Sequence, residues 1–268
     1  MDEQQPEQQP GLDQGGRRGI YLLPNLLTTG ALFAGFYAII GAIDGHYDRS
    51  GMALLIAVIL DGLDGRMARL TGTESEFGRE YDSLSDLVAF GLAPALVVYQ
   101  WGLVRLADFG WIWGKVGWLA AFVYAVSAAL RLARFNVHTH AADRRFFEGL
   151  ASPPAAGMVF GMVWLATDLG WSGGLALAGA CAVTVVAGLL MVSRIPYYSF
   201  KEITPKGRIP FTYVFLVPLV FVLIALNPPT AVFAIAGTYG MSGPVLAVWR
   251  WQRRRARRRQ GQAEVRRG

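Results

Sequence analysis

The sequence has little of what soluble enzymes and disulfide-linked proteins use. Its 268 residues include one Cys, three His and only 16% charged residues. One Cys allows no internal disulfide and no thiolate metal site, and because Cys181 lies within an apolar run we expect it to serve packing alone. The sequence also lacks a Ser-His-Asp set, a phosphate-binding Gly-rich loop and a basic groove with interleaved aromatic residues. Triad hydrolysis, P-loop chemistry and nucleic-acid binding are therefore not expected.

Long apolar runs occupy most of the chain instead. Hydrophobic residues make up 53% of it, in repeated stretches long enough to cross a bilayer. We predict an all-α polytopic membrane protein, a helical bundle of about eight transmembrane helices. The expected spans are residues 21–43, 50–70, 83–104, 112–135, 152–168, 173–192, 209–226 and 229–249.

Polar segments flank this predicted membrane domain, which covers residues 20–250. Residues 1–19 are rich in Gln and Pro and lack the apolar region of a signal peptide, so we expect a disordered tail. Residues 251–268 form a basic tail. Two interpretations of the basic tail stay open, because its arginines suit either binding to anionic lipid headgroups or a topology signal with no further role.

The distribution of Lys and Arg predicts the orientation in the membrane. If both termini are cytoplasmic, 22 of the 25 basic residues lie in cytoplasmic segments, and the exceptions are Arg49, Arg105 and Lys115. This bias predicts an integral protein of the cell (inner) membrane, with its termini and its active site at the cytoplasmic face. His138 and His140 then fall in a cytoplasmic loop, where a solvated position is more expected than a ligand role.

Four Asp residues concentrate in one stretch, which reads DGLDGRMARLTGTESEFGREYDSLSD. On a helix Asp61 and Asp64 share a face, while Gly78, Asp82 and Asp86 recur at every fourth residue along the next helix. If the two faces oppose each other, the carboxylates surround one small volume. Such an all-oxygen cluster suits a divalent cation, Mg²⁺ or Mn²⁺, and has charge enough for two. The plainer interpretation is an acidic loop at a helix end, but carboxylates within a membrane are costly without a partner.

Neighbouring residues extend this pattern. Small residues at Gly65, Ala68 and Gly78 would let a flat nucleotide lie against the backbone, and Arg69 can pair with a phosphate. Two metal ions beside such an arginine fit displacement at phosphorus, in which an alcohol attacks in line. Outside enzymes the alternative is a divalent-cation channel or carrier, although the charge of Arg69 would oppose cation conduction.

This stretch resembles the signature of the CDP-alcohol phosphotransferase family. The resemblance implies transfer of a substituted phosphate from a CDP-linked substrate to a second alcohol, with release of CMP. It implies that Asp61, Asp64, Asp82 and Asp86 bind the cations and that Asp86 is the general base. It also implies a homodimer, which the small residues of GALFAG and GLALAGA would suit. The signature positions are Asp61, Asp64, Gly65, Ala68, Arg69, Gly78, Asp82 and Asp86.

Further strings resemble one branch of that family, the membrane-integral phosphatidylserine synthases. This resemblance implies CDP-diacylglycerol and L-serine as substrates, at the surface of a lipid bilayer. Two positions differ from the pattern of the branch, Ala151 in place of an expected Pro and Pro196 before a pair of tyrosines. Both lie outside the predicted metal site. The strings are PNLLTTG from Pro24, SLSDLVAFGLAPA from Ser83, LRLARFN from Leu130, FEGLASPPAAG from Phe147 and PYYSFKE from Pro196.

Serine differs from other acceptors in offering a carboxylate and an ammonium group. Arg131 and Arg134 share a helix face at the end of the fourth span, so we predict that they hold the carboxylate and that Asn136 takes the ammonium or a hydroxyl. We also predict that Asn25 and Thr28 contact the phosphate or ribose of the CDP-lipid. Arginine snorkelling and helix capping are the structural alternatives for these residues. Glycerol 3-phosphate, inositol phosphate and choline stay open as other acceptors, although choline would call for an aromatic cage.

Overall fold

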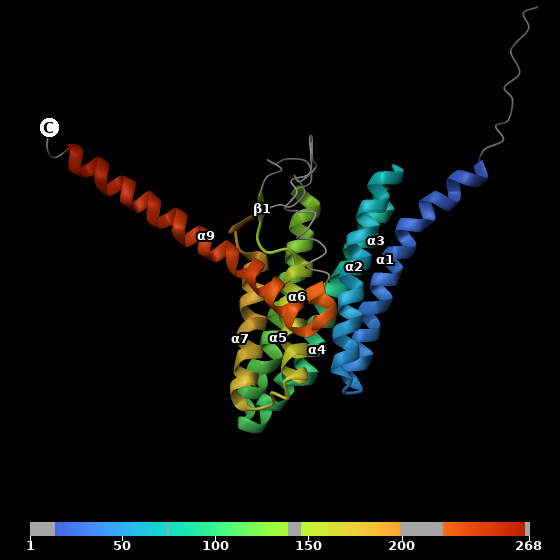
Figure 1. Ribbon diagram of the computed structural model, residues 1–268, viewed down its shortest axis with the longest axis horizontal. Coiled ribbons are helices and arrows are strands. Elements are labelled where there is room, and N and C mark those ends of the chain that lie inside the picture. Colours follow the sequence, from blue (N-terminus) through green and yellow to red (C-terminus); the bar gives the residue numbers. More distant parts are fainter. Residues whose placement is uncertain (1–13, 74, 139–145, 199–221, 266–268) are drawn as a thin grey trace, which may run out of the picture.

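The described part of the chain is a bundle of helices with a small two-stranded sheet (Figure 1). The computed structural model describes residues 14–73, 75–138, 146–198 and 222–265. In these ranges the predicted helical class is confirmed, apart from the two short strands. The elements are α1 (Gln14–Ile43), α2 (Tyr47–Thr71), α3 (Glu76–Asp86), the π-helix η1 (Leu87–Leu92), α4 (Ala93–Trp101), the 3₁₀-helix η2 (Leu103–Phe109), α5 (Trp111–His138), β1 (Phe146–Glu148), α6 (Ser152–Asp168), α7 (Gly174–Val192), β2 (Pro196–Tyr198) and α9 (Pro228–Val265). Residues 222–226 are also helical.

Five helical stretches among the described residues are long and apolar enough to cross a membrane. They make the chain an integral membrane protein, whereas the predicted count of eight spans is not confirmed. The last turns of α2 carry charged residues, α6 has only 17 residues, and most of the predicted span 209–226 lies outside the described residues. The five stretches are Leu23–Ile43, Glu76–Phe109, Trp111–Val137, Gly174–Val192 and Pro228–Trp249.

The predicted tails differ from the structure at their inner boundaries. Helix α1 begins at Gln14, inside the stretch 1–19 expected to be a tail, and α9 continues to Val265 through most of the basic segment 251–268. The basic segment contains no Pro, and Arg, Gln and Ala are good helix formers, so nothing in it stops the last helix. The rest of both tails lies outside the described residues.

A tight turn joins the two helices that carry the carboxylates. Beyond α2, Gly72 has a φ of 63°, the left-handed conformation that Gly adopts without strain, and its N–H donates to the carbonyl of Ala68. Helix α3 begins after Ser75, whose hydroxyl accepts the N–H of Gly78 at 3.0 Å. The turn returns the chain alongside α1, with the carboxylates of α3 directed toward those of α2.

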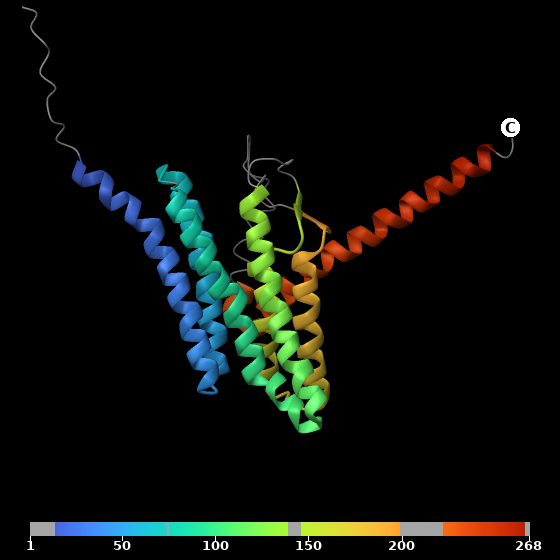
Figure 2. The same cartoon turned by 180° about the vertical axis from the view of Figure 1, so that it is seen from behind.

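Close contacts at glycines fix the helices against one another. A Cβ on Gly35 of α1 would lie 2.7 Å from the Cα of Ala89, and one on Gly51 of α2 would lie 2.5 Å from the ring of Trp164 in α6. Backbone and ring therefore approach closer than any larger residue allows. Seen from behind, α3 and α4 run from the α1–α2 pair toward α5, so this segment connects the two halves of the bundle (Figure 2).

The two strands contact α9, which crosses the bundle over α6 (Figure 1). Strand β1 pairs antiparallel with β2. Tyr197 of β2 is buried, and its hydroxyl donates to the carbonyl of Gly240 in α9 at 2.8 Å. Burial raises the pKa of Tyr197 to about 12, so the neutral hydroxyl is the donor. Helix α9 packs on α6, where a Cβ on Gly161 would lie 3.1 Å from the backbone of Phe233.

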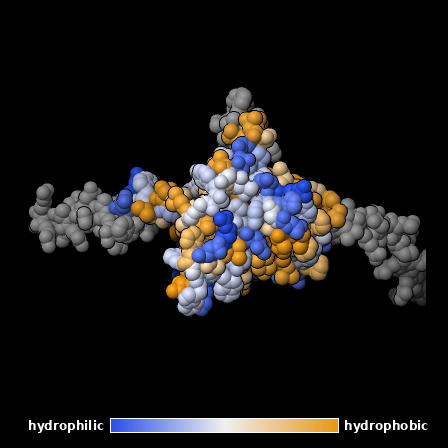
Figure 3. Space-filling model, turned by 90° about the horizontal axis from the view of Figure 1, so that it is seen from below, coloured by the Kyte–Doolittle hydropathy of each residue, from blue (hydrophilic) through white to orange (hydrophobic). Residues whose placement is uncertain are grey.

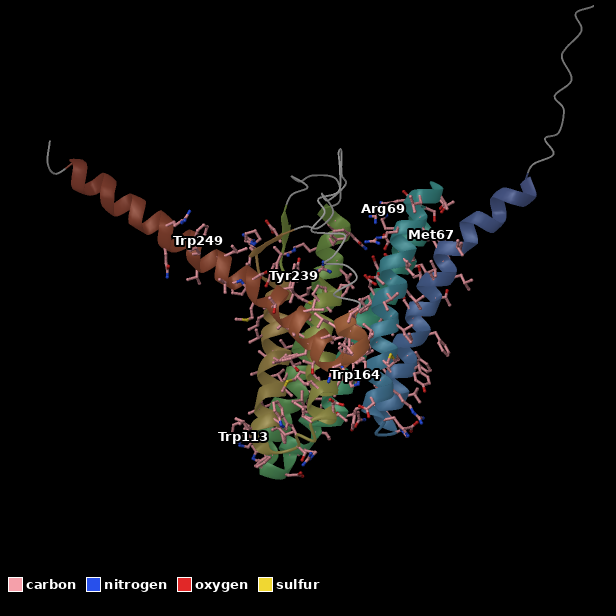
Figure 4. All side chains as sticks on the ribbon, in the orientation of Figure 1. Met67, Arg69, Trp113, Trp164, Tyr239 and Trp249 are labelled. Carbon is pink, nitrogen blue, oxygen red and sulfur yellow. The ribbon has the colours of Figure 1, made fainter. Side chains whose placement is uncertain are left out.

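The two ends of the bundle differ in character. The N-terminal part of α1, strand β1 and the C-terminal part of α9 rise on the same side (Figure 1). Arg69 lies toward that side and Trp113 at the opposite end (Figure 4). Trp111 and Trp113 are exposed there, as is typical of a membrane interface. Viewed from that opposite end, hydrophilic residues gather over the middle and hydrophobic residues toward the flanks, as expected for sides that face lipid (Figure 3).

Candidate active site

The structure brings the four predicted carboxylates together. One oxygen from each of Asp61, Asp64 and Asp82 lies within 4.8 Å of the others, and Asp86 lies within hydrogen-bonding reach of Asp61. Asp64 is only 5% exposed, and the other three are half-buried. Carboxylates this close repel one another unless a cation or a proton lies among them. The arrangement therefore favours a bound positive charge.

A threonine and a serine fix the geometry of this cluster. The hydroxyl of Thr28 in α1 donates to Asp64 Oδ2 at 2.7 Å. The hydroxyl of Ser85 in α3 donates to the backbone carbonyl of Thr28 at 3.1 Å. These bonds tie α2 and α3 to α1 beside the carboxylates. Thr28 was predicted as a contact of the CDP-lipid, and the structure gives its hydroxyl to Asp64 instead; the lipid contact stays a prediction.

The donor set fits a hard divalent cation. Asp82 Oδ1 is buried and has no hydrogen-bond partner among the described residues. A buried acceptor without a partner calls for a ligand. Carboxylate oxygens are the ligands that Mg²⁺ and Mn²⁺ prefer. Asp61, Asp64 and Asp82 would hold such an ion, with Asp86 beside them.

The signature residues of α2 share one face, because their spacing is i, i+3, i+4, i+7 and i+8. Next to the carboxylates, no atom of another described helix lies within 4 Å of the position that a Cβ on Gly65 would take. Ala68 is half-buried, and Arg69 is exposed at the end of the same face (Figure 4). A flat group can therefore approach the backbone at Gly65, while the guanidinium of Arg69 stays accessible to an anion.

Gly78 of α3 has a different surrounding from Gly65. A Cβ at this position would stand 3.0 Å from the hydroxyl oxygen of Ser75 and 3.4 Å from Asn25 Oδ1. Gly78 therefore lets α3 approach the side chain of Asn25 on α1. The structure places Asn25 beside the α3 part of the signature, as a contact with the same nucleotide would require.

Arg131 of α5 faces the carboxylates from the other half of the bundle. Its Nη1 donates to the hydroxyl of Ser152, at the start of α6, at 3.0 Å. Its buried Nε has no hydrogen-bond partner among the described residues. The electrostatic neighbours of this guanidinium include Asp86 and Tyr239 of α9. A guanidinium with an unused N–H is thus within electrostatic range of Asp86.

Arg134 and Asn136, one turn further along α5, have partners of a different kind. Arg134 donates to the backbone carbonyl of Glu148 at 2.7 Å and to that of Val192 at 3.4 Å. It therefore ties β1 to the end of α7. Asn136 Nδ2 lies 3.1 Å from the hydroxyl of Ser83 in α3. The structure thus brings Asn136 to the carboxylate helix, whereas it holds Arg134 on backbone carbonyls.

Several residues of the site were missed by sequence reasoning. Ser83, Ser85 and Ser152 each bind a predicted site residue or its helix. Ser83 and Ser85 stand between Asp82 and Asp86, and Ser152 opens the SPP start of α6, so each stood next to a motif. Nothing in the local pattern indicated which partner each would meet.

The chain belongs to the CDP-alcohol phosphatidyltransferase family, whose model matches residues 21–194. This range contains all of the residues predicted for the site and ends before α9. Among curated proteins, the chain is similar to the CDP-diacylglycerol–serine O-phosphatidyltransferase of Helicobacter pylori, with 35% identity over 225 residues, 84% of this chain and 90% of the relative.

Two further relatives widen the comparison. The CDP-diacylglycerol–serine O-phosphatidyltransferase of Mycobacterium leprae is 33% identical over 226 residues, 82% of this chain and 72% of the relative. The archaetidylserine synthase of Methanothermobacter thermautotrophicus is 34% identical over 177 residues, 65% of this chain and 69% of the relative. The serine acceptor is common to the names of all three relatives, while the lipid differs in the archaeal one.

Proposed function

We propose that this protein transfers the phosphatidyl group of CDP-diacylglycerol to the hydroxyl of L-serine, which gives phosphatidylserine and CMP. The observation that carries the proposal is the cluster of four carboxylates, Asp61, Asp64, Asp82 and Asp86. Beside this cluster, the backbone at Gly65 is open to a ligand. Membership of the family supports the phosphoryl chemistry. The names of the relatives support serine as the acceptor.

On this proposal the chain binds the CDP-lipid between α1, α2 and α3. Asp61, Asp64 and Asp82 would hold Mg²⁺ or Mn²⁺, which when bound neutralises the diphosphate and the departing phosphate of CMP. Arg69 pairs with a phosphate, and Asn25 and Thr28 line the adjoining wall. The small residues Gly65 and Ala68 leave room for the nucleotide, and Gly78 lets α3 approach Asn25 so that both can line the same pocket.

The acceptor then attacks from the α5 side. Asp86 takes the proton of the serine hydroxyl while its oxygen bonds to phosphorus and the bond from phosphorus to the CMP oxygen breaks. Arg131 and Arg134 are proposed to hold the carboxylate of serine, and Asn136 its ammonium group. The unpartnered Nε of Arg131 supports this arrangement.

We further propose that the site faces the cytoplasm of the cell (inner) membrane, that the cations number two, and that the protein is a homodimer. The bias of basic residues toward one side supports the orientation. The charge of four neighbouring carboxylates supports a pair of divalent cations.

Purified protein in detergent, given CDP-diacylglycerol and a panel of labelled alcohols, tests the function. We expect CMP release and phosphatidylserine formation with serine, no turnover in EDTA, and recovery on addition of Mg²⁺ or Mn²⁺. Asp61→Ala, Asp82→Ala and Asp86→Asn should each lower kcat at least about a hundredfold, because a lost ligand or base removes several kcal/mol of transition-state stabilisation.

A matched control is Asp44→Asn, which changes a carboxylate in the turn between α1 and α2, outside the cluster. It should leave the rate unchanged. Full turnover in EDTA would refute the role of the cation, and faster transfer to glycerol 3-phosphate than to serine would refute the acceptor. A cation carrier would release no CMP at all.

A further inference from the structure

The helix that carries Asp82 and Asp86 does not continue as an α-helix. Directly after Asp86 it passes into the π-helix η1, at whose end the N–H of Ala93 donates to the carbonyl of Val88, five residues earlier. One extra residue in a turn rotates the side chains before it by about 100° relative to those after it, compared with a continuous α-helix. The direction of the two carboxylates therefore depends on this turn.

A proline in the sequence favours the irregular turn. In an α-helix, residue 94 would donate its N–H to the carbonyl of Phe90, but Pro94 has no N–H to give. Tyr124 of α5 donates its hydroxyl to this carbonyl at 2.9 Å. Both Tyr124 and Phe90 are fully buried, so no water can take the place of the hydroxyl.

Tight packing anchors both partners of this hydrogen bond. A Cβ on Gly188 of α7 would lie 3.2 Å from the Cα of Tyr124, so α5 is pressed against α7 at the tyrosine. On the η1 side, a Cβ on Gly91 would lie 3.1 Å from the Cβ of Ala128 in α5. The tyrosine hydroxyl is thus a polar link between a firmly packed α5 and the π-turn.

We infer that Tyr124 is a positioning residue, which holds the π-turn so that Asp82 and Asp86 face the carboxylates of α2. It acts through the carbonyl of Phe90 and not by contact with substrate. The inference rests on the proposed function for its kinetic consequence, but its consequence for the binding of a cation does not require the reaction.

The experiment compares Tyr124→Phe with Tyr47→Phe. Tyr47 is the control, because its hydroxyl also donates to a backbone carbonyl. The acceptor is Gln100 in α4, the helix that follows η1, at 3.0 Å. Tyr47 lies at the start of α2, whereas Asp61 and Asp64 lie in the later turns of that helix. Both variants lose one hydroxyl and one hydrogen bond to a backbone carbonyl. Because Tyr124 is fully buried and Tyr47 half-buried, the melting temperature of each variant is measured beside Mn²⁺ binding, so that a loss of stability is separated from a loss of the site.

Mn²⁺ binding to the purified full-length protein in detergent is measured by electron paramagnetic resonance, beside kcat and KM. For Tyr124→Phe we expect the Mn²⁺ dissociation constant to rise about three- to tenfold and kcat to fall by a similar factor, as the loss of one buried hydrogen bond predicts. When Mn²⁺ is saturating, the KM for CDP-diacylglycerol should change less than about twofold, because the protein contacts proposed for the nucleotide are unaltered. Tyr47→Phe should match the wild type in all three values.

If Tyr124→Phe binds Mn²⁺ and turns over like Tyr47→Phe, the inference is wrong, even if both variants melt at a lower temperature. An equal loss of Mn²⁺ affinity in both variants would also overturn it, because the effect would then be general. If the wild type binds Mn²⁺ but transfers no phosphatidyl group, the proposed function fails. A weaker Mn²⁺ affinity of Tyr124→Phe alone would then still support the positioning role.

Discussion

Two arginines that look equivalent in the sequence have different surroundings in the structure. Arg131 donates a hydrogen bond from Nη1 to the hydroxyl of Ser152. Its Nε is buried and has no hydrogen-bond partner among the described residues. Arg134 donates to the carbonyls of Glu148 and Val192. Arg131 therefore has an N–H available for an anion within electrostatic range of Asp86. Arg134 joins β1 to the end of α7. Both remain predicted contacts of the acceptor, and their substitutions should differ in what else they change.

Arg131→Ala is expected to lower kcat/KM for serine about ten- to a hundredfold, because a charge-assisted pair with the carboxylate is lost, while the KM for CDP-diacylglycerol moves little. Arg131→Lys should recover part of the loss, since a point charge replaces a planar fork.

Arg134→Ala should lower kcat/KM for serine as well, and it should also lower the melting temperature more than Arg131→Ala does. Steady-state kinetics with each substrate varied, and thermal melting in detergent, measure these effects. Equal weakening of both substrates by Arg131→Ala would contradict the acceptor role.

At the scale of elements, glycines decide how the helices meet. Gly35 allows α1 to touch η1 at Ala89, and Gly51 allows α2 to touch the ring of Trp164 in α6. Because η1 follows Asp86 directly, the first contact also sets how α3 lies against α1. Packing between helices is thus coupled to the site through one short segment.

Gly35→Ala should destabilise the protein by about 1–3 kcal/mol, since the added Cβ would stand 2.7 Å from the Cα of Ala89 and backbone must shift. We expect a lower melting temperature and a lower kcat. Gly237→Ala in α9 is the control, because no atom of another described element lies within 4 Å of its Cβ position. It should be neutral or stabilising by up to about 1 kcal/mol. Identical melting temperatures for the two variants would show that the α1–η1 contact is not tight.

For the whole molecule, the distribution of charge and of aromatic residues distinguishes two membrane sides. Arg69 lies toward one end of the bundle, and Trp113 lies at the other (Figure 4). Arg105 and Lys115 are near the second end in sequence and among the few basic residues there. The rule that basic loops stay in the cytoplasm predicts that the carboxylates open to that compartment.

Accessibility of single cysteines tests this orientation. In a Cys181→Ala background, Ser172→Cys, in the exposed turn between α6 and α7, should react with a membrane-impermeant maleimide added to intact cells. Glu76→Cys, at the start of α3, should react only after the membrane is permeabilised, because the predicted cytoplasmic side is shielded. The reverse pattern of labelling would invert the topology and place the site outside the cytoplasm.

The sequence by itself determined the membrane class and the signature of the site. Composition and run length suffice for the first, because a bilayer requires long apolar helices. Periodicity suffices for the second, because residues three and four apart on a helix share a face whatever the helix packs against. The spacing alone therefore assigns Asp61 with Asp64 to one helix face and Asp82 with Asp86 to another. The count of spans could not be predicted in this way, since α2 mixes charged and apolar residues.

Only the tertiary structure decided which residues from different helices meet. The bonds from Thr28 to Asp64, from Ser85 to the carbonyl of Thr28 and from Tyr124 to that of Phe90 join residues 36, 57 and 34 positions apart. Their pairing depends on the rotation and height of each helix in the bundle, which close contacts such as that at Gly35 set. Pro94 lacks the N–H that the carbonyl of Phe90 would accept in an α-helix, but the local sequence contains no information on which distant hydroxyl binds that carbonyl instead.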